Sequence, residues 1–339
     1  MPLPNSVAEG NICDLHVGSW NVAGLAEDEV DTFIDQVSDH YPWDILMLQE
    51  GFRRSEGIAL ASKHLLFTSG QISGGLRCPA LLIHERWARD DSGFVKFAGS
   101  GTRWVAVELN AKYIFVSLHL PHRKISTETY AETLAEVTTL LRAHAGKTAI
   151  IGMDANVTVE GIVDYVQVGE SVQSSAYWPG KEDRTQLLHE FLCSHGLTLT
   201  NTFMDAEGDG LSTRTNWSGF GSAQVDFIAA PLTLPCEMVE VDQSMEFSAD
   251  HRMVFANYSI HQPSAPTHCR PSVKDWKPDE TWASAAEDIH WNFMDWHEFA
   301  PVWSETAYSH RQRRQQNRDI LLDDLLNEHA QSNIDERKQ

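Results

Sequence analysis

The sequence lacks the features that direct a chain to a membrane or to an oxidising compartment. No apolar run reaches the ~18 residues of a membrane span, and residues 1–6 have neither the basic nor the apolar region of a secretory signal. The cysteines are few, odd in number and without a CxxC pair, at Cys13, Cys78, Cys193, Cys236 and Cys269. We therefore expect free thiols and an intracellular protein, and the sequence does not choose between nucleus and cytoplasm.

Basic residues are also scarce. Lysine and arginine together number 26, against 48 aspartate and glutamate residues, and the net charge is −22. Affinity for nucleic acid comes largely from neutralising phosphates, so this balance argues against a tight, non-specific DNA-binding protein. It leaves room for an enzyme that meets nucleic acid through a local basic rim and a divalent cation, because such cations bind clusters of acidic side chains.

Internal repeats and low-complexity tracts are absent as well, and short apolar runs recur instead. Runs rich in β-branched and aliphatic residues predict strands at 15–20, 45–48, 80–84, 104–109, 113–118, 148–151, 197–200, 225–229 and 253–260. Apolar residues at helical spacing predict helices at 28–38, 126–144 and 184–195, the second with Ser126 as its N-cap. Strands mixed with a few helices indicate an α/β or α+β fold, in which 104–109 and 113–118 form an antiparallel hairpin.

The composition changes near residue 260. Three prolines between 263 and 271 predict a linker over 261–272. Five tryptophans follow between 276 and 303, and then a polar helical pattern from about 311 to 328. We therefore predict a domain over 1–260, the linker, and a Trp-rich segment with a C-terminal polar helix over 273–339.

Polar side chains stand at the ends of the predicted strands. They are Asn21, Glu50, His119, Asp154, Asn156, Asp226, Asp250 and His251. Strands packed in a sheet bring their ends together, so these side chains can converge on one cleft. Carboxylates such as Glu50 and Asp250 are hard oxygen ligands of the kind Mg²⁺ prefers. A further carboxylate could take a proton from water, and an aspartate beside a histidine would favour the charged imidazole.

These residues resemble, in their order, the motifs of the endonuclease/exonuclease/phosphatase superfamily, which includes DNase I, apurinic/apyrimidinic endonucleases and the endonuclease domains of non-LTR retrotransposons. The matching segments are Ser19-Trp20-Asn21, Leu48-Gln49-Glu50, Gly152-Met153-Asp154-Ala155-Asn156, Val225-Asp226-Phe227-Ile228 and Ser248-Ala249-Asp250-His251. The superfamily's Gly-Asp-Phe-Asn and Ser-Asp-His motifs each have one inserted residue here, although the Asp-x-Asn spacing is kept. The resemblance covers roughly residues 12–260.

The resemblance implies a metal site. Asn21, Glu50 and Asp250 would hold Mg²⁺, or Mn²⁺ in its place. His119 stands where some members of the superfamily have tyrosine and others histidine, and it would protonate the leaving oxygen. The sequence does not identify an acidic partner for this histidine.

The resemblance also implies roles in the chemistry. Asp154 would activate or orient the nucleophilic water, and Asn156 would hold the scissile phosphate. Asp226 would support His251, which would contact or protonate the phosphate oxygens. Each residue taken alone also fits an ordinary turn or surface position.

The fold that the resemblance implies is a four-layer sandwich of two packed, mainly antiparallel β-sheets flanked by helices, with the site at one rim. The segments Gly74-Gly75-Leu76, Asn201-Thr202-Phe203 and Thr213-Arg214-Thr215-Asn216-Trp217 look like those of retroelement endonucleases. We therefore expect a Mg²⁺-dependent phosphodiester hydrolase that nicks DNA, as a truncated retroelement product or a cellular relative. The alternatives are a phosphatase or phosphodiesterase acting on RNA or on lipid or inositol headgroups, and a non-catalytic remnant. The oligomeric state stays open.

Other polar residues near the motifs have two interpretations. His119-x-x-His122 has a spacing seen in some zinc sites, but no cysteine or further histidine lies nearby in the sequence. Arg103, Arg123 and Arg214 would form a basic rim for nucleic acid if they faced the cleft, whereas a narrow pocket would suit a headgroup. A solvated arginine is the simpler interpretation of Arg103 and Arg214, and a loop position that of His122 and Arg123.

Overall fold

The computed structural model describes residues 12–25, 29–52, 57–61, 64–69, 77–89, 95–162, 164–173, 182–204, 211–215, 221–242 and 250–261. The chain divides into two units, Met1–Arg270 and Pro271–Gln339, and all described residues belong to the first. Several predicted features therefore lie outside the described residues and stay predictions. They are the linker beyond His261, the Trp-rich segment, the polar helix, Gly74–Leu76, Asn216–Trp217 and Ser248–Ala249.

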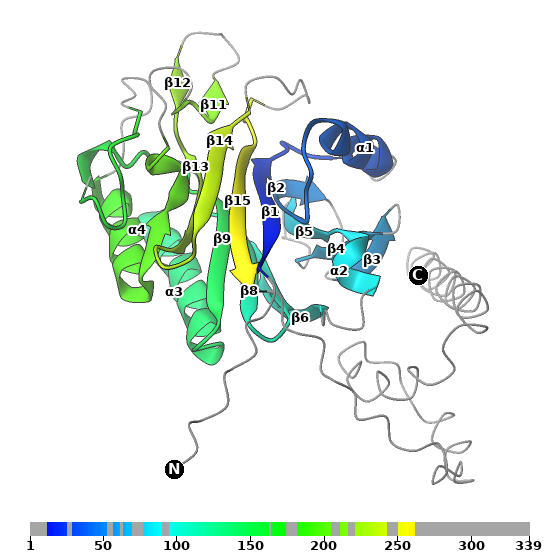
Figure 1. Ribbon diagram of the computed structural model, residues 1–339. Coiled ribbons are helices and arrows are strands. Elements are labelled where there is room, and N and C mark those ends of the chain that lie inside the picture. The colour runs from blue at the N-terminus through cyan, green and yellow to red at the C-terminus, as the bar shows by residue number, and fades with distance from the viewer. Residues whose placement is uncertain are drawn as a thin grey trace, which may run out of the picture. The chain divides into compact units, whose positions relative to one another are not determined.

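A seven-stranded sheet forms one half of the described unit (Figure 1). In spatial order its strands are β14 (Cys236–Val241), β15 (Val254–His261), β1 (Ile12–Asn21), β2 (Ile45–Phe52), β5 (Cys78–Ile83), β4 (His64–Thr68) and β3 (Gly57–Ala61). Only β1 and β2 pair in parallel, and the other neighbours are antiparallel. The register pairs Asn21 with Gln49, so Asn21, the last residue of β1, and Glu50, shortly before the end of β2, lie at the same end of the sheet.

A six-stranded sheet faces the first. Its spatial order is β10 (Leu197–Leu199), β13 (Asp226–Pro231), β9 (Thr148–Asp154), β8 (Tyr113–His119), β7 (Trp104–Leu109) and β6 (Val95–Gly101). Again one pair is parallel, β8 with β9, and its register sets His119 opposite Asp154. The antiparallel partner β13 sets Asp226 opposite Asp154 from the other side. A two-stranded ribbon, β11 (Arg214–Thr215) and β12 (Ser222–Ala223), lies near the same ends.

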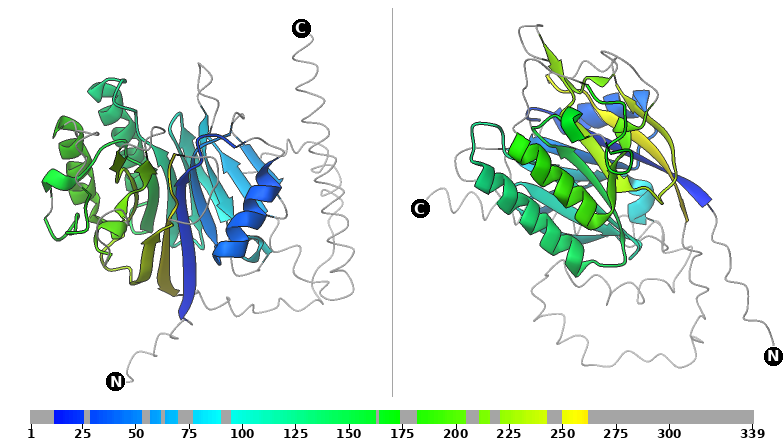
Figure 2. Two further views of the ribbon diagram at one scale, coloured as in Figure 1. Left: turned by 90° about the horizontal axis from the view of Figure 1, so that it is seen from above. Right: turned by 90° about the vertical axis from the view of Figure 1, so that its left-hand side faces the viewer.

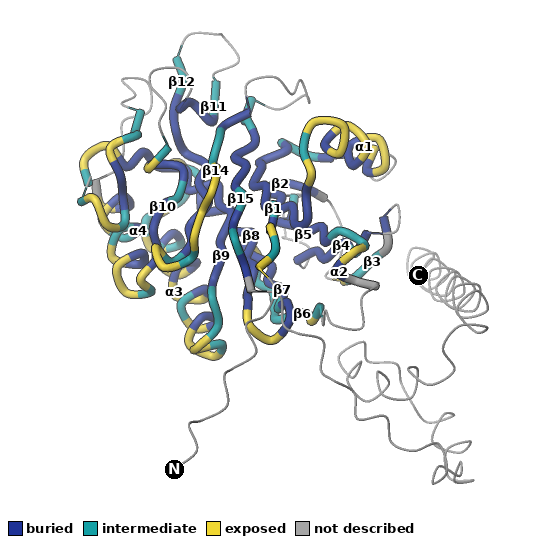
Figure 3. Tube along the Cα trace, in the orientation of Figure 1, coloured by how far each residue is buried: buried dark blue, intermediate teal, exposed yellow. Residues whose placement is uncertain are grey.

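The apolar faces of the two sheets pack together and form the central core. Val17 and Met47 from one sheet and Phe115, Ile150 and Ile228 from the other belong to a single buried cluster. Burial of such side chains is the main favourable term in folding. Figure 3 shows the central strands mostly dark blue, as buried residues, and much of the outer helical surface and of the edge strand β14 yellow or teal, as exposed or half-buried residues.

Helices cover the outer faces of both sheets and complete four layers (Figure 2). Helix α1 (Val30–His40) buries an i, i+3, i+4, i+7 stripe that includes Phe33 and Val37 against the seven-stranded sheet. Helices α3 (Thr127–Ala143) and α4 (Glu182–His195) lie side by side on the six-stranded sheet. The predicted N-cap is confirmed, since Ser126 Oγ accepts a hydrogen bond from Thr129 N. A short helix, α2 (Glu85–Arg89), follows β5.

The predicted four-layer sandwich of mainly antiparallel sheets is confirmed, and each sheet contains one parallel pair. The four described cysteines are free thiols, as expected. No helix among the described residues is long and apolar enough to cross a membrane.

Candidate active site

Asp154, the last residue of β9, is the centre of the candidate site. Its side chain is almost fully buried, and Asn21 Nδ2 donates a 2.8 Å hydrogen bond to its Oδ2. The same Asn21 nitrogen lies 3.3 Å from Glu50 Oε1. The ends of β1, β2 and β9, from both sheets, therefore meet in one hydrogen-bonded group, as the sequence predicted for strand ends.

Glu50 reaches this group through an unusual backbone. Its φ is +49°, in the left-handed region that a residue with a Cβ seldom adopts. The pairing of β2 with β5 is irregular at the same place, between Leu48 and Phe52. Such strain persists only where the surrounding structure enforces it, and it occurs often at functional sites. Glu50 is also the most exposed of the grouped carboxylates, at 39% of its side chain.

Asn21 faces the carboxylates with its amide nitrogen. Its Oδ1 accepts the backbone N–H of Ala23 at 2.9 Å, which fixes the orientation of the amide group. The predicted neutral oxygen ligand is thus engaged by the backbone, and Asn21 acts here as a hydrogen-bond donor that spaces Glu50 and Asp154.

His119, at the end of β8, supplies a third group. Its Nε2 lies 3.5 Å from Glu50 Oε1 and 3.9 Å from Asp154 Oδ2, so the structure identifies the acidic neighbours that the sequence left open. Burial lowers the pKa of this histidine, against the raising effect of the two carboxylates. His122, three residues on, belongs to no described cluster of three or more potential metal ligands.

His251 and Asp226 form the predicted pair. His251 Nδ1 lies 2.8 and 3.1 Å from the two oxygens of Asp226, and both side chains are buried. Burial alone would lower the pKa of His251, but the charge and hydrogen bond of Asp226 raise it to about 9. The imidazole is therefore a cation at neutral pH, with its Nε2–H left to donate.

Asp250 stands apart from the other predicted metal ligands. Nε and Nη2 of Arg214 both lie 3.0 Å from its Oδ2, and its Oδ1 lies 3.8 Å from His251 Nε2. Among the described residues, no cluster of three or more potential ligands joins Asp250 to Glu50. A metal role for Asp250 stays a prediction, and Arg214 engages only its Oδ2.

Asn156 follows Asp154 in a tight turn. Its φ is +52°, a conformation that asparagine tolerates better than most residues, and its backbone N–H donates to Asp154 Oδ1. Its Nδ2 donates to the carbonyl of Leu120 at 3.0 Å. The buried Asn156 amide is thus tied to the end of β8, beside the position where a phosphate is predicted to bind.

A polar layer between the sheets, which the sequence did not reveal as such, supports the site. Gln49 is fully buried, and its Nε2 lies 3.2 to 3.3 Å from Ser19 Oγ, Ser117 Oγ and the carbonyl of Gly152. The backbones approach closely here, because a Cβ on Gly152 would lie 2.7 Å from Ser19 Oγ. The only signal in the sequence was that these polar residues occur inside apolar strands.

Two further residues position Asp226. Thr213 Oγ1 accepts the backbone N–H groups of Val225 and Asp226, both at 3.0 Å. Asn201 Nδ2 donates to the carbonyl of Asp226 at 3.1 Å. The sequence singled out both segments, but the role of these two residues in holding β13 could not be predicted without the pairing of the strands.

The arginines differ from the simpler interpretation given to them. Arg103 is 7% exposed rather than solvated, and burial lowers its pKa. Arg214 pairs with Asp250 instead of facing bulk water alone. Arg123 is exposed, in the loop that follows β8. The prediction of solvated side chains was therefore wrong for Arg103 and Arg214, because the first is buried and the second forms an ion pair.

Comparison by sequence finds no matching family model and no matching curated protein. Comparison by structure does find similar folds. The endonuclease domain of TRAS1, a telomere-specific non-LTR retrotransposon, is 18% identical with a TM-score of 0.50, over 72% of this chain and 98% of that domain. The apurinic/apyrimidinic endonuclease LMAP from Leishmania major is 9% identical with a TM-score of 0.55, over 73% of this chain and 88% of that enzyme.

Both structures share with this chain the two packed sheets and their flanking helices, and each is covered nearly whole. At identities this low the likeness concerns the fold. The chain has the DNase I-like fold of the endonuclease/exonuclease/phosphatase superfamily.

Proposed function

We propose that this chain is a Mg²⁺-dependent phosphodiester hydrolase, and specifically a DNA-nicking endonuclease of retroelement type. One observation carries the proposal. The buried carboxylate of Asp154 lies between a carboxylate–imidazole group, Glu50 with His119, and the charged pair of Asp226 with His251. This arrangement offers a base, a cation-binding edge and a proton donor within one small volume.

The donor set fits a hard divalent cation. Ligand atoms of Glu50, His119 and Asp154 lie within 4.8 Å of one another, and Mg²⁺ is commonly held by one or two carboxylates with water and substrate oxygens completing the shell. Glu50 would hold the ion, Mg²⁺ or Mn²⁺, while the Asp154 carboxylate beside it is kept as the base. A bound Mg²⁺ supplies neutralisation of charge on the phosphodiester.

The protein groups around that edge divide the proton transfers. Burial raises the pKa of Asp154, and the nearby Asp226 raises it further, so this carboxylate takes a proton from water more readily than an ordinary aspartate. His251, held cationic by Asp226, donates from Nε2 to a phosphate oxygen. His119, whose burial favours the neutral ring, is placed to orient the leaving oxygen or water.

A local basic region supports nucleic acid as the substrate. The pKa of His122 is lowered by burial and then by four cations around it, Arg214, Arg123, Lys124 and Arg184. Arg123 and Lys124 are exposed in the loop after β8, whereas Arg184 is buried and Arg214 pairs with Asp250, and the chain as a whole carries −22. Clustered cations beside a site are the electrostatic requirement for binding a phosphate backbone. The similarity of the fold to a retrotransposon endonuclease supports the same assignment.

The test is nicking of supercoiled plasmid by the full chain with Mg²⁺. We expect relaxation that EDTA and the Asp154→Ala variant both abolish, while Asp35→Ala, an exposed position on α1, leaves the rate unchanged. A folded protein that leaves the plasmid intact would contradict the endonuclease assignment. Turnover of RNA or of lipid or inositol phosphate headgroups would then identify the substrate class, and inactivity on all of them would identify a non-catalytic remnant.

A further inference from the structure

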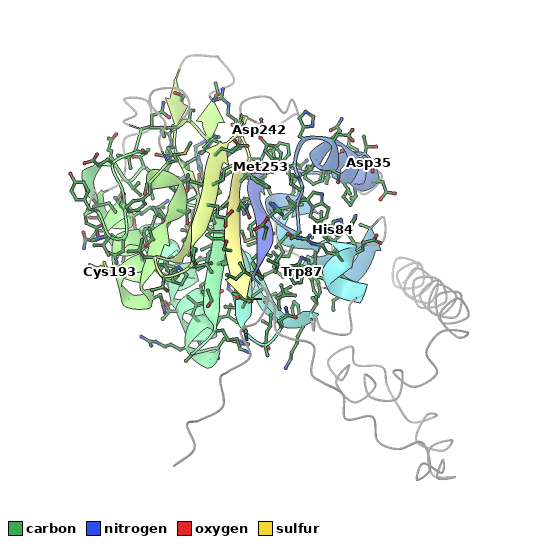
Figure 4. The ribbon with its side chains drawn as sticks, viewed as in Figure 1. Asp35, His84, Trp87, Cys193, Asp242 and Met253 are labelled. Atoms are coloured by element: carbon green, nitrogen blue, oxygen red, sulfur yellow. The ribbon has the colours of Figure 1, made fainter. Side chains whose placement is uncertain are left out.

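A second cluster of potential metal ligands lies outside the candidate active site. It is formed by Asp164, in the loop after the short helical turn Glu160–Ile162, and by His189 and Cys193, one turn apart on α4. Asp164 Oδ2 lies 2.6 Å from His189 Nε2, and Cys193 Sγ lies 3.6 Å from the same nitrogen. Figure 4 labels Cys193 at the periphery of the molecule, on α4. Neither the proposed chemistry nor the fold requires this grouping.

The carboxylate of Asp164 is held rigidly for this contact. Its Oδ1 accepts backbone N–H groups from Val166, Gln167 and Val168 at 2.8 to 3.0 Å, which leaves Oδ2 to face α4. Burial alone would raise the pKa of Asp164, but these hydrogen bonds and that of His189 lower it to about 2. Asp164 is therefore an anion with one oxygen committed to the loop and one available to a ligand on the helix.

The geometry excludes a nucleophile relay. In a Cys–His–Asp relay the thiol and the carboxylate contact opposite ring nitrogens, because the imidazole must pass a proton from one side to the other. Here both Cys193 Sγ and Asp164 Oδ2 face Nε2 of His189. One nitrogen cannot serve both partners well with a single hydrogen, whereas a cation placed between the three atoms would satisfy all of them.

We propose that Asp164, His189 and Cys193 bind Zn²⁺, with water or an exogenous ligand in the fourth position. Thiolate, imidazole and carboxylate are the ligand types that Zn²⁺ takes, at about 2.0–2.3 Å in tetrahedral geometry. Ligand atoms around such an ion stand roughly 3.3–3.8 Å apart. The separation of sulfur and nitrogen already fits at 3.6 Å, and the 2.6 Å contact between oxygen and nitrogen must open by less than ~1 Å.

Binding has a defined proton balance. The Cys193 thiol loses its proton to solvent and binds as the thiolate, and a neutral His189 keeps its hydrogen on Nδ1 so that Nε2 is free to ligate. The ion joins α4 to the loop 164–168, two segments that otherwise meet there through the hydrogen bond of His189 with Asp164. Its effect is thus on the stability of α4 and this loop, separate from hydrolysis at Asp154.

Cobalt(II) is the probe that separates this site from the catalytic one. The full chain, stripped of metal and kept reduced, is titrated with Co²⁺, and we expect a near-ultraviolet sulfur-to-cobalt charge-transfer band that Zn²⁺ displaces. The band should vanish in Cys193→Ser and His189→Ala. It should persist in Cys236→Ser, an exposed cysteine on β14, and in Asp154→Ala, because the candidate active site contains no cysteine among its described groups.

A milder variant tests the third ligand. Asp164→Asn keeps an oxygen for the three backbone N–H groups but removes the charge. We expect Zn²⁺ affinity to fall at least roughly 10–100-fold, which is the loss that follows removal of a residue that only supports a ligand. Zn²⁺ should also raise the thermal midpoint of the wild-type chain more than that of Cys193→Ser. Absence of the band in the wild type, or its survival in Cys193→Ser, overturns the proposal, whatever the result of the nicking assay.

Discussion

Two buried aspartates lie at opposite ends of β2. Asp44 immediately precedes β2 and is 0% exposed. Asp154 ends β9, lies close to Glu50 near the other end of β2, and is 1% exposed. Burial of a carboxylate is costly unless donors compensate for the lost water. The two ends of the packed sheets meet this requirement in opposite ways.

Asp44 is surrounded by donors. The backbone N–H of His16 donates to Oδ2 at 2.8 Å, Trp87 Nε1 donates to Oδ1 at 2.7 Å, and the guanidinium of Arg86 forms an ion pair with both oxygens. Figure 4 labels Trp87 and the adjacent His84 in this region. Asp44 thus ties β1, β2 and α2 together and has no unused oxygen to offer a substrate.

Asp154 is surrounded by other titratable groups instead. Its hydrogen bonds come from Asn21 and from the backbone of Asn156, and Asp226, His119 and His251 lie close by. Its pKa is raised by burial and by Asp226. A buried carboxylate with enough donors and cations around it stabilises the fold. One with too few has a perturbed pKa and is a candidate for catalysis. The comparison predicts opposite responses to mutation.

The largest effect should come from Asp154→Asn. Removal of the base should lower the nicking rate by roughly 10²–10⁴-fold, and the free energy of unfolding should stay the same or rise, since a poorly compensated buried charge is lost. Plasmid nicking and thermal melting of the same preparation measure both. Activity within tenfold of the wild type, in a folded variant, would remove Asp154 from the proposed chemistry.

The reciprocal change is Asp44→Asn. Arg86 and Trp87 then lose their anionic acceptor, and we expect the free energy of unfolding to fall by about 2–3 kcal/mol, less than for a fully buried pair because the Arg86 side chain is 50% exposed. The nicking rate per folded molecule should not change. Denaturant unfolding measures the loss, with the exposed Asp35→Asn as control (labelled in Figure 4). A rate defect without a stability defect would contradict the comparison.

A smaller effect is expected in the pH dependence. Because the pKa of His251 is raised to about 9, the cation persists through neutral pH and activity should fall as pH rises through about 9. The stability that this pair contributes is fully present below pH 6.5 and is lost over the same rise. In Asp226→Asn, the pH at which kcat/KM falls on the alkaline side should move down from about 9 toward 6.5 or below. If the fall in kcat/KM stayed near pH 9 in this variant, it would belong to a group other than His251.

Much of the fold followed from local pattern. The apolar runs at 104–109 and 113–118 are β7 and β8, and the helical stripe of Val30, Phe33, Ile34 and Val37 is buried on α1. The strands missed include β6 and β14 at sheet edges, and also β4, which pairs with β3 and β5 on its two sides. The edge strands have a clear reason for being missed. Their residues are partly exposed and lack a continuous apolar run, so the sequence signal for strands fails there.

The sequence predicted some features of the candidate site and missed others. The sequence predicted which residues end the strands, and it paired Asp226 with His251 correctly. It did not predict that Asn21 would face its neighbours as a donor, or that Arg214 would engage Asp250. Those partners depend on rotamers and on which strands are adjacent, and neither is encoded by residue type alone.

The sequence by itself determined the chemistry that is available: carboxylates, amides and histidines placed where apolar strands end. The tertiary structure alone decided which of these groups become neighbours. Parallel pairing of β8 with β9 and antiparallel pairing of β9 with β13 set His119, Asp154 and Asp226 side by side. Gln49 then fixes the distance between the two sheets from within. The reason is physical: residue type sets what a group can donate or accept, but pKa and reactivity depend on neighbours that only long-range packing brings within a few ångströms.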